Sequence, residues 1–103
     1  MTKLVERLEA ILAGGEDTAL LRFSLGNGYL SDDPAQAINH LRQAVALDPA
    51  YSAAWKILGK ALVQNGDESA AIDAYTTGIK VAESNGDKQA AKEMQIFLRR
   101  LLR

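Results

Sequence analysis

The chain has 103 residues, a formal net charge of −1 and no cysteine. A single domain of this length is expected to bury a core without disulfides or Cys-based zinc sites. The near-neutral charge argues against general nucleic-acid binding, and no apolar stretch approaches the roughly 20 residues of a membrane span. Because no signal-peptide core follows the amino terminus, we expect a cytoplasmic protein.

Apolar residues recur at helical spacing along the chain, which predicts an all-α fold. The predicted helices cover residues 1–15, 17–29, 34–47, 51–64, 68–83 and 86–103. Turn signals separate them, because Gly14-Gly15, Asn65-Gly66 and Asn85-Gly86 suit helix ends. Asp33 and Pro34 suit the N-cap and the first position of the third helix. Turns this short make consecutive helices antiparallel neighbours.

The four middle helices contain an internal repeat. Leu25-Gly26 aligns with Leu58-Gly59 at a shift of 33 residues, and Ala37–Leu41 aligns with Ala71–Tyr75 at a shift of 34. Self-similarity at this period is typical of helical solenoids. A glycine inside a helix costs about 0.5–1 kcal/mol relative to alanine. The two helical glycines therefore indicate that a paired helix approaches closely.

The repeated pattern resembles the tetratricopeptide repeat. The spacing Trp55-x-x-Leu58-Gly59-x-x-Leu62 carries the resemblance, together with the alignments above. It implies a right-handed α-solenoid of antiparallel helix pairs within a single domain, 1–103. Its expected parts are an N-terminal capping helix in 1–15, repeat 1 in 19–51, repeat 2 in 52–85 and a C-terminal capping helix in 86–103.

Two residues depart from the family pattern. Arg22 stands where the first copy would have tryptophan, and Glu83 stands where the second copy would have proline. The missing proline predicts that the fifth helix continues by half a turn or more. The capping helices are expected to turn apolar faces inward. The predicted inward residues are Leu4, Leu8, Ile11 and Leu12 in the first helix, and Ala91, Met94, Phe97, Leu98 and Leu101 in the last.

Candidate catalytic and metal-binding residues are few. His40 is the single histidine, and without a second histidine or a cysteine it is interpreted as a solvated surface residue. Asp32-Asp33 precedes proline and is interpreted as a turn and a helix cap rather than a catalytic pair. Trp55 is assigned to the interface between helices rather than to a binding hot spot. We predict no catalysis, no metal and no cofactor.

By resemblance, the first helix of each repeat lines a concave groove that holds a protein or peptide segment. The groove positions implied in this way are Phe23, Asn27, Leu30, Lys56, Lys60 and Val63. On the last helix Lys88 and Lys92, with Gln95 and Arg99, form a polar stripe. If this stripe faces the groove, the groove is basic and the expected segment is acidic. The alternative interpretation is that these are ordinary solvated lysines.

Some members of the family grip a C-terminal carboxylate through lysine, asparagine and arginine side chains. Asn27 matches one such position, but Phe23 and Ile57 replace two others, so that clamp is not expected. Two functions remain open. One is a monomeric adaptor that binds a protein segment. The other is a structural module that self-associates as a weak homodimer through Leu98, Leu101 and Leu102.

Overall fold

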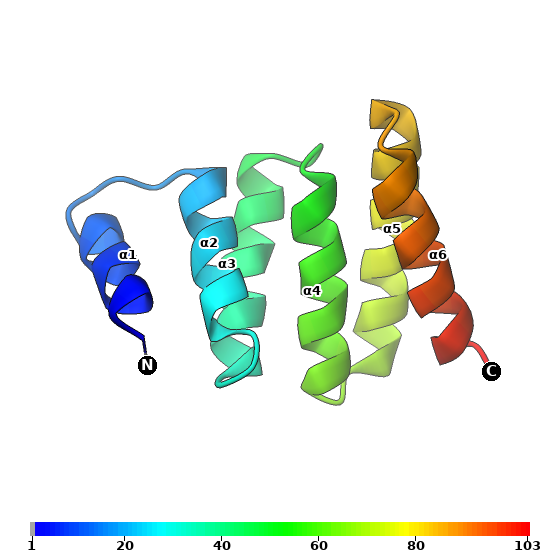
Figure 1. The fold of residues 1–103 in the computed structure, drawn as a ribbon, viewed down its shortest axis with the longest axis horizontal. Helices are drawn as coiled ribbons and strands as arrows, with labels where there is room; N and C mark the ends of the chain where they lie inside the picture. Colours follow the sequence, from blue (N-terminus) through cyan, green and yellow to red (C-terminus); the bar gives the residue numbers. More distant parts are fainter. Residues whose placement is uncertain (1) are drawn as a thin grey trace.

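The computed structural model describes residues 2–103, and over this range the chain forms six α-helices and no strand (Figure 1). The helices are α1 (Lys3–Ala13), α2 (Ala19–Tyr29), α3 (Pro34–Leu47), α4 (Ser52–Gln64), α5 (Glu68–Asn85) and α6 (Lys88–Leu101). The all-α prediction is confirmed. Helix α5 runs beyond Glu83 to Asn85, so the predicted continuation is confirmed too.

Side-chain caps fix where five of these helices begin. Asp33, Asp67 and Asp87 each accept a hydrogen bond from the backbone N–H three residues later, at 3.2–3.3 Å. Thr2 and Thr18 cap α1 and α2 in the same way, at 3.2 and 3.1 Å. Each cap satisfies an N–H group that has no partner within its own helix. The sequence therefore determines these starts through local chemistry alone.

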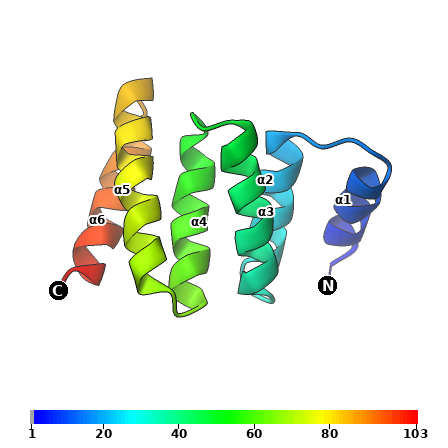
Figure 2. The same ribbon diagram turned by 180° about the vertical axis from the view of Figure 1, so that it is seen from behind.

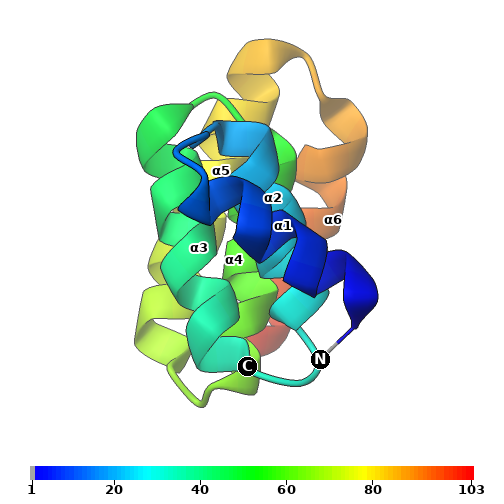
Figure 3. The ribbon, with the colours of Figure 1, turned by 90° about the vertical axis from the view of Figure 1, so that its left-hand side faces the viewer.

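The helices are arranged in two layers. Helices α2, α4 and α6 lie on the face seen in Figure 1, and α3 and α5 lie on the face seen in Figure 2. Helix α1 packs on α2 and crosses the end of the stack (Figure 3). The molecule measures 41 × 28 × 18 Å along its principal axes. Helix pairs stacked along one long axis make a solenoid-like repeat fold, as predicted.

The helical glycines lie where paired helices cross. A Cβ atom at Gly26 would overlap the side chain of Leu41, and a Cβ atom at Gly59 would overlap the ring of Tyr75. Both partners are fully or almost fully buried. The close approach predicted from the repeated Leu-Gly pair is therefore confirmed in both helix pairs.

Trp55 fills the junction between α4, α5 and α6. A Cβ atom at Gly78 would lie 2.8 Å from the Cβ of Trp55 and 2.6 Å from the sulfur of Met94. The Trp55 indole N–H donates to the carbonyl oxygen of Pro49 at 2.9 Å. The side chain borders both hydrophobic clusters of the core. These contacts agree with the assignment of Trp55 to the helix interface.

The inward face of α1 differs from the predicted one. Leu4 is 61 % exposed and Ile11 is also exposed, whereas Val5 is only 1 % exposed. Val5 packs against Gly28, where an added Cβ atom would lie 2.7 Å from a Val5 methyl group. The members of the predicted stripe that pack against the core are Leu8 and Leu12. The stripe is therefore rotated, because Gly28 leaves a notch in α2 that a β-branched side chain fills.

The inward face of α6 is as predicted. Met94 and Ala91 are buried, and partly exposed apolar side chains extend the same face. Those partly exposed residues are Phe97, Leu98 and Leu101. Leu102, which follows the helix, is exposed. Helix α6 thus covers the apolar side of α5 and closes that end of the core.

Candidate functional site

The α2–α4–α6 face carries the groove positions that were predicted on α2 and α4. Those positions are Phe23 and Asn27 on α2, Leu30 at the C-cap of α2, and Lys56, Lys60 and Val63 on α4. Spacings of three and four residues place each set along one side of its helix. The Phe23 ring lies 5.0 Å from the ring of Tyr51, at the start of α4, so the two rows are adjacent. Asn27 and Val63 are exposed, and the other four side chains are partly buried.

Leu20 extends the row on α2 and was not among the predicted groove residues. It precedes Phe23 by three residues and Asn27 by seven, so the three side chains share one side of the helix. Its side chain is 65 % exposed. An exposed leucine beside an aromatic ring gives this end of the face an apolar character.

The two predicted lysines of α4 have different surroundings. Lys56 Nζ lies 3.5 Å from a carboxylate oxygen of Glu93 on α6. Lys60 Nζ lies 5.2 Å from the centre of the Phe97 ring, also on α6. An ion pair neutralises the first charge, whereas a cation over an aromatic face keeps its charge available to another anion. Lys60 is therefore the better candidate for binding an acidic group.

The structure does not bring Lys88 and Lys92 to these lysines. The α6 side chains that contact Lys56 and Lys60 are Glu93 and Phe97, respectively. At about 100° per residue, both Lys88 and Lys92 lie about 100° or more around the helix from those contacts. Both are exposed. The α6 side chain beside Lys56 is therefore the acidic Glu93. The predicted basic groove required the stripe with Lys88 and Lys92 at this place.

A hollow of about 250 Å³ lies between α4 and α6. Its lining residues are Lys60, Val63, Gln64, Tyr75, Phe97, Arg100 and Leu101. Only Lys60 and Val63 were predicted as site residues. The others come mainly from α5 and α6, whose placement opposite α4 depends on tertiary packing. The sequence of α6 does contain an aromatic residue and basic residues that could line a site. The helical spacing of its apolar residues, however, predicted that this helix packs against the core.

Two cations line this hollow and no carboxylate does. The guanidinium carbon of Arg100 lies 5.9 Å from the centre of the Phe97 ring, which Lys60 also approaches. Among the residues described by the structure, neither cation takes part in an ion pair. Two unneutralised cations around one ring favour a bound anion.

Tyr75 of α5 lines the same hollow and carries a hydroxyl group. It is 2 % exposed, and burial raises the pKa of its hydroxyl to about 12, so the group is protonated at neutral pH. Its ring lies 5.8 Å from the Phe97 ring. Within residues 2–103 its hydroxyl has no hydrogen-bond partner. Because the hydroxyl oxygen has no partner among these residues and keeps some solvent contact, it is available to a ligand.

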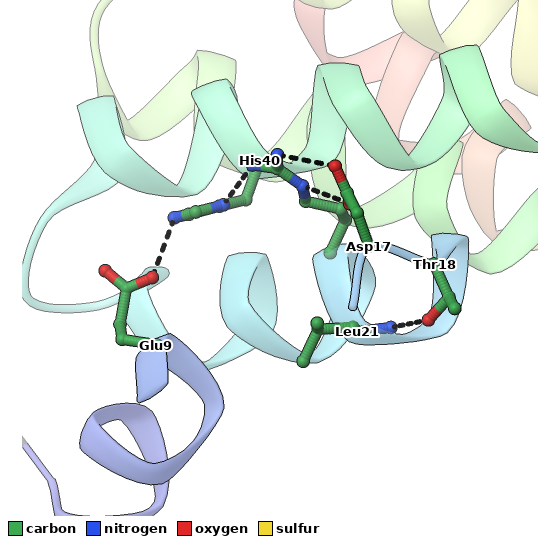
Figure 4. A network of polar contacts seen from close by, with 6 residues as sticks. Glu9, Asp17, Thr18, Leu21 and His40 are labelled. Atoms are coloured by element: carbon green, nitrogen blue, oxygen red, sulfur yellow. Dashed lines mark hydrogen bonds and ion pairs between the residues drawn. The ribbon is translucent and has the colours of Figure 1, made fainter. Parts of the chain in front are cut away.

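A second polar cluster joins α1, α2 and α3 (Figure 4). His40 is only 4 % exposed, so its interpretation as a solvated residue is wrong. Its ring stacks on Tyr29 at 5.6 Å, and its Nδ1 lies 3.1 Å from Nη1 of Arg22. Arg22 also pairs with Asp17 at 2.7 Å. Glu9 accepts a hydrogen bond from the Tyr29 hydroxyl at 2.8 Å and lies 3.8 Å from Nε2 of His40.

The protonation state of His40 follows from these neighbours. Arginine only donates hydrogen bonds, so Nδ1 of His40 acts as the acceptor and the ring proton is assigned to Nε2. Desolvation lowers the pKa of His40 below its ordinary value of 6.5, and Arg22 lowers it further, although Glu9 acts in the opposite direction. The cluster is therefore built around a neutral imidazole. The one feature of the sequence that could have indicated this polar cluster is Arg22, which stands where the tetratricopeptide repeat pattern has tryptophan.

No group of three or more His, Cys, Asp or Glu side chains within residues 2–103 is placed to hold a metal ion. None of the six helices described above is both long and apolar enough to cross a membrane.

Comparison with known proteins gives consistent similarities. A family model described as tetratricopeptide repeat matches residues 29–94. A tetratricopeptide repeat-containing protein of Pseudomonas aeruginosa is 52 % identical over 99 residues, which cover 95 % of this chain and 94 % of the relative. The solution structure of a Bordetella parapertussis protein is 50 % identical, with a TM-score of 0.84 over 99 % of this chain and 90 % of that one. The crystal structure of a Salinibacter ruber tetratricopeptide repeat domain protein is 27 % identical, with a TM-score of 0.76 and coverages of 82 % and 96 %.

Proposed function

The chain belongs to the tetratricopeptide repeat family, whose members are generally non-catalytic protein-interaction modules, and from this premise we propose that its α2–α4–α6 face binds an extended segment of a partner protein. The observation that carries the proposal is the row of accessible side chains that the neighbouring helices α2 and α4 present on this face. The row runs from Leu20 and Asn27 on α2 to Lys60 and Val63 on α4, and it ends at the hollow beside α6.

The chemistry of the row suits a peptide. Asn27 offers both a donor and an acceptor for peptide groups, while Leu20 and Phe23 offer apolar contact area. The hollow adds a concave element, and interface energy tends to concentrate in such pockets. Since the face needs no metal or cofactor for these contacts, recognition depends on the partner's side chains and backbone.

A pair of variants tests this face without disturbing the hollow. Leu20→Arg with Asn27→Arg adds two charges to exposed positions of α2, seven residues apart. Gln36→Arg with Gln43→Arg is the matched control, because both glutamines are exposed on α3 and have the same spacing. Circular dichroism establishes that both variants fold.

Affinity capture from the native cell, quantified by mass spectrometry, provides the measurement. We expect a partner that the wild type and the α3 variant both capture, and that the α2 variant loses. Equal capture by all three proteins would contradict the proposal.

Self-association is the alternative proposal, and the geometry supports it less well. Leu98 and Leu101 pack against the core, so of the three leucines proposed for a dimer contact only Leu102 is fully available. A stable interface between two protein chains usually buries about 1,200 Å² or more in total. Native mass spectrometry at micromolar concentration separates the alternatives, because a dimer that Leu102→Ser abolishes would favour self-association.

A further inference from the structure

We propose that the hollow between α4 and α6 is an anchor pocket for a tyrosine side chain of the partner segment, with an aspartate or glutamate next to that tyrosine bound by Lys60 and Arg100. This inference rests on the proposed function and specifies what one part of the face recognises. Three features of the hollow support it: its size and walls, its uncompensated charge and its unpartnered hydroxyl.

The size and the walls favour one large side chain. At about 250 Å³ the hollow is smaller than the roughly 300–1,000 Å³ typical of small-molecule sites. Its walls include Val63, Phe97 and Leu101, so the lining is mainly apolar and partly aromatic. An aromatic ring packs well in such a space because offset and edge-to-face contacts with Phe97 add to the burial of apolar area.

The positive charge of the hollow favours an acidic residue next to the tyrosine in the partner segment. Glu93, which pairs with Lys56, does not line the hollow. Lys60 and Arg100 come from different helices and approach the same Phe97 ring. A carboxylate at the rim would accept charge-assisted hydrogen bonds from both cations. A carboxylate adjacent in sequence to the anchoring residue would lie close to this rim.

The hydroxyl of Tyr75 distinguishes tyrosine from a purely apolar anchor. A leucine or phenylalanine in the hollow would exclude water from this hydroxyl without providing a hydrogen bond, which is unfavourable for a buried polar group. Tyrosine combines an apolar ring with a hydroxyl that both donates and accepts. Its hydroxyl can therefore pair with that of Tyr75 while its ring contacts Phe97.

Peptide titration of the ¹⁵N-labelled 103-residue chain tests the pocket directly. The probes are blocked heptapeptides, Gly-Ser-Asp-X-Asp-Ser-Gly, with tyrosine, phenylalanine or alanine at X, and a fourth peptide in which both aspartates of the tyrosine probe are asparagine. Amide chemical shifts report both the affinity and the place of binding. We expect the tyrosine probe to shift amides around Lys60 and Phe97, with a dissociation constant of about 1 mM or lower.

The other probes are expected to bind more weakly. The loss should be about three- to tenfold for phenylalanine, as for one hydrogen bond, and about tenfold or more for alanine and for the asparagine peptide. Tyr75→Phe should equalise the tyrosine and phenylalanine probes. Arg100→Gln should reduce the preference for the aspartate probe over the asparagine probe, with Lys60 accounting for the preference that remains. The control Arg42→Gln, an exposed change on α3, should alter none of these ratios.

Three outcomes would overturn the inference. They are the absence of shifts at millimolar peptide, shifts confined to other surfaces, and equal binding of the alanine probe. None of them affects the proposed function if the α2 variant still loses its partner, because Leu20 and Asn27 lie outside the hollow. Failure of the anchor and failure of the interaction face are therefore distinguishable.

Discussion

Gly59 of α4 lies directly against the ring of Tyr75 of α5, and this contact connects the repeat pattern with the candidate pocket. The missing side chain leaves room for the ring between the two helices. The same ring then continues into the lining of the hollow. Gly59, which allows the two helices to pack closely, therefore also positions the Tyr75 side chain at the hollow.

Gly59→Ala should destabilise the protein and disturb the hollow. The added methyl group would overlap the Tyr75 ring, which is buried and cannot move freely. Overpacking of this kind usually costs about 1–3 kcal/mol. Gly28→Ala is the matched control, because its methyl group would meet only one Val5 methyl, on the terminal helix. Urea denaturation should give a clearly larger loss for Gly59→Ala, and equal midpoints would contradict the packing argument.

Val5 is expected to hold α1 in place, although the sequence favoured other residues of the helix. Val5→Ala should lower the free energy of unfolding by about 1–3 kcal/mol, because the side chain is almost fully buried. Leu4→Ala should have an effect within about 0.5 kcal/mol, since the leucine is largely exposed. Hydrogen exchange of the α1 amides would show whether the helix opens. The reverse order of the two effects would mean that α1 packs through the predicted stripe.

The rotation of α1 shows where sequence reasoning reached its limit. Helix starts could be predicted because the capping aspartates act on backbone groups three residues away. The close helix crossings could be predicted because Gly26 and Gly59 recur at the repeat period. The inward face of α1 could not, since Val5 is buried only because Gly28, far along the chain, leaves space for it.

Packing between residues distant in the sequence also explains why only part of the candidate site was predicted. The proposed groove positions of α2 and α4 were predicted from the repeat, but Phe97 and Arg100 line the hollow because of how α6 packs against α4. His40 was misinterpreted for a related reason. Asn39 and Gln43 beside it on α3 are polar and exposed, yet His40 shares the buried side of the helix with Ala37 and Ala44. There it contacts Glu9 of α1 and both Arg22 and Tyr29 of α2.

His40 should make stability depend on pH. Burial lowers its pKa in the folded state, so the unfolded chain takes up the proton first as the pH falls. The contribution of His40 is therefore fully present above the unfolded pKa of about 6.5, and it is lost progressively below that value. The lowered pKa of Asp17 acts in a separate and more acidic window, below about 3.8.

Urea midpoints measured between pH 7.5 and pH 5 should decrease for the wild type. His40→Gln removes the titrating group and should flatten this dependence, although its stability at pH 7.5 is also expected to be lower. The charged groups that face His40 are Glu9 from α1, Arg22 from α2 and Asp17 from the preceding loop. A wild-type midpoint that stays constant over this range would contradict the assignment of a neutral, buried imidazole.

Charge reversal should separate the two lysines of α4. Lys56→Glu would place a second carboxylate beside Glu93, whereas Lys60→Glu would place one at the rim of the hollow. Because the Lys56–Glu93 pair is partly exposed, breaking it should cost less than about 1 kcal/mol of stability. Lys60→Glu should weaken binding of the acidic tyrosine peptide by about tenfold or more, since attraction becomes repulsion.

The exchanged pair Lys56→Glu with Glu93→Lys provides the matched control. It keeps the net charge and restores an ion pair between α4 and α6, so both stability and peptide binding should stay near the wild-type values. Peptide titration of the three proteins gives the decisive comparison. If Lys56→Glu weakened binding as much as Lys60→Glu, while the exchanged pair remained weak, the acidic group would be bound by Lys56 itself. The contact between Lys56 and Glu93 would then be one that a partner displaces, and the charge recognition assigned to the hollow would belong to the row on α4.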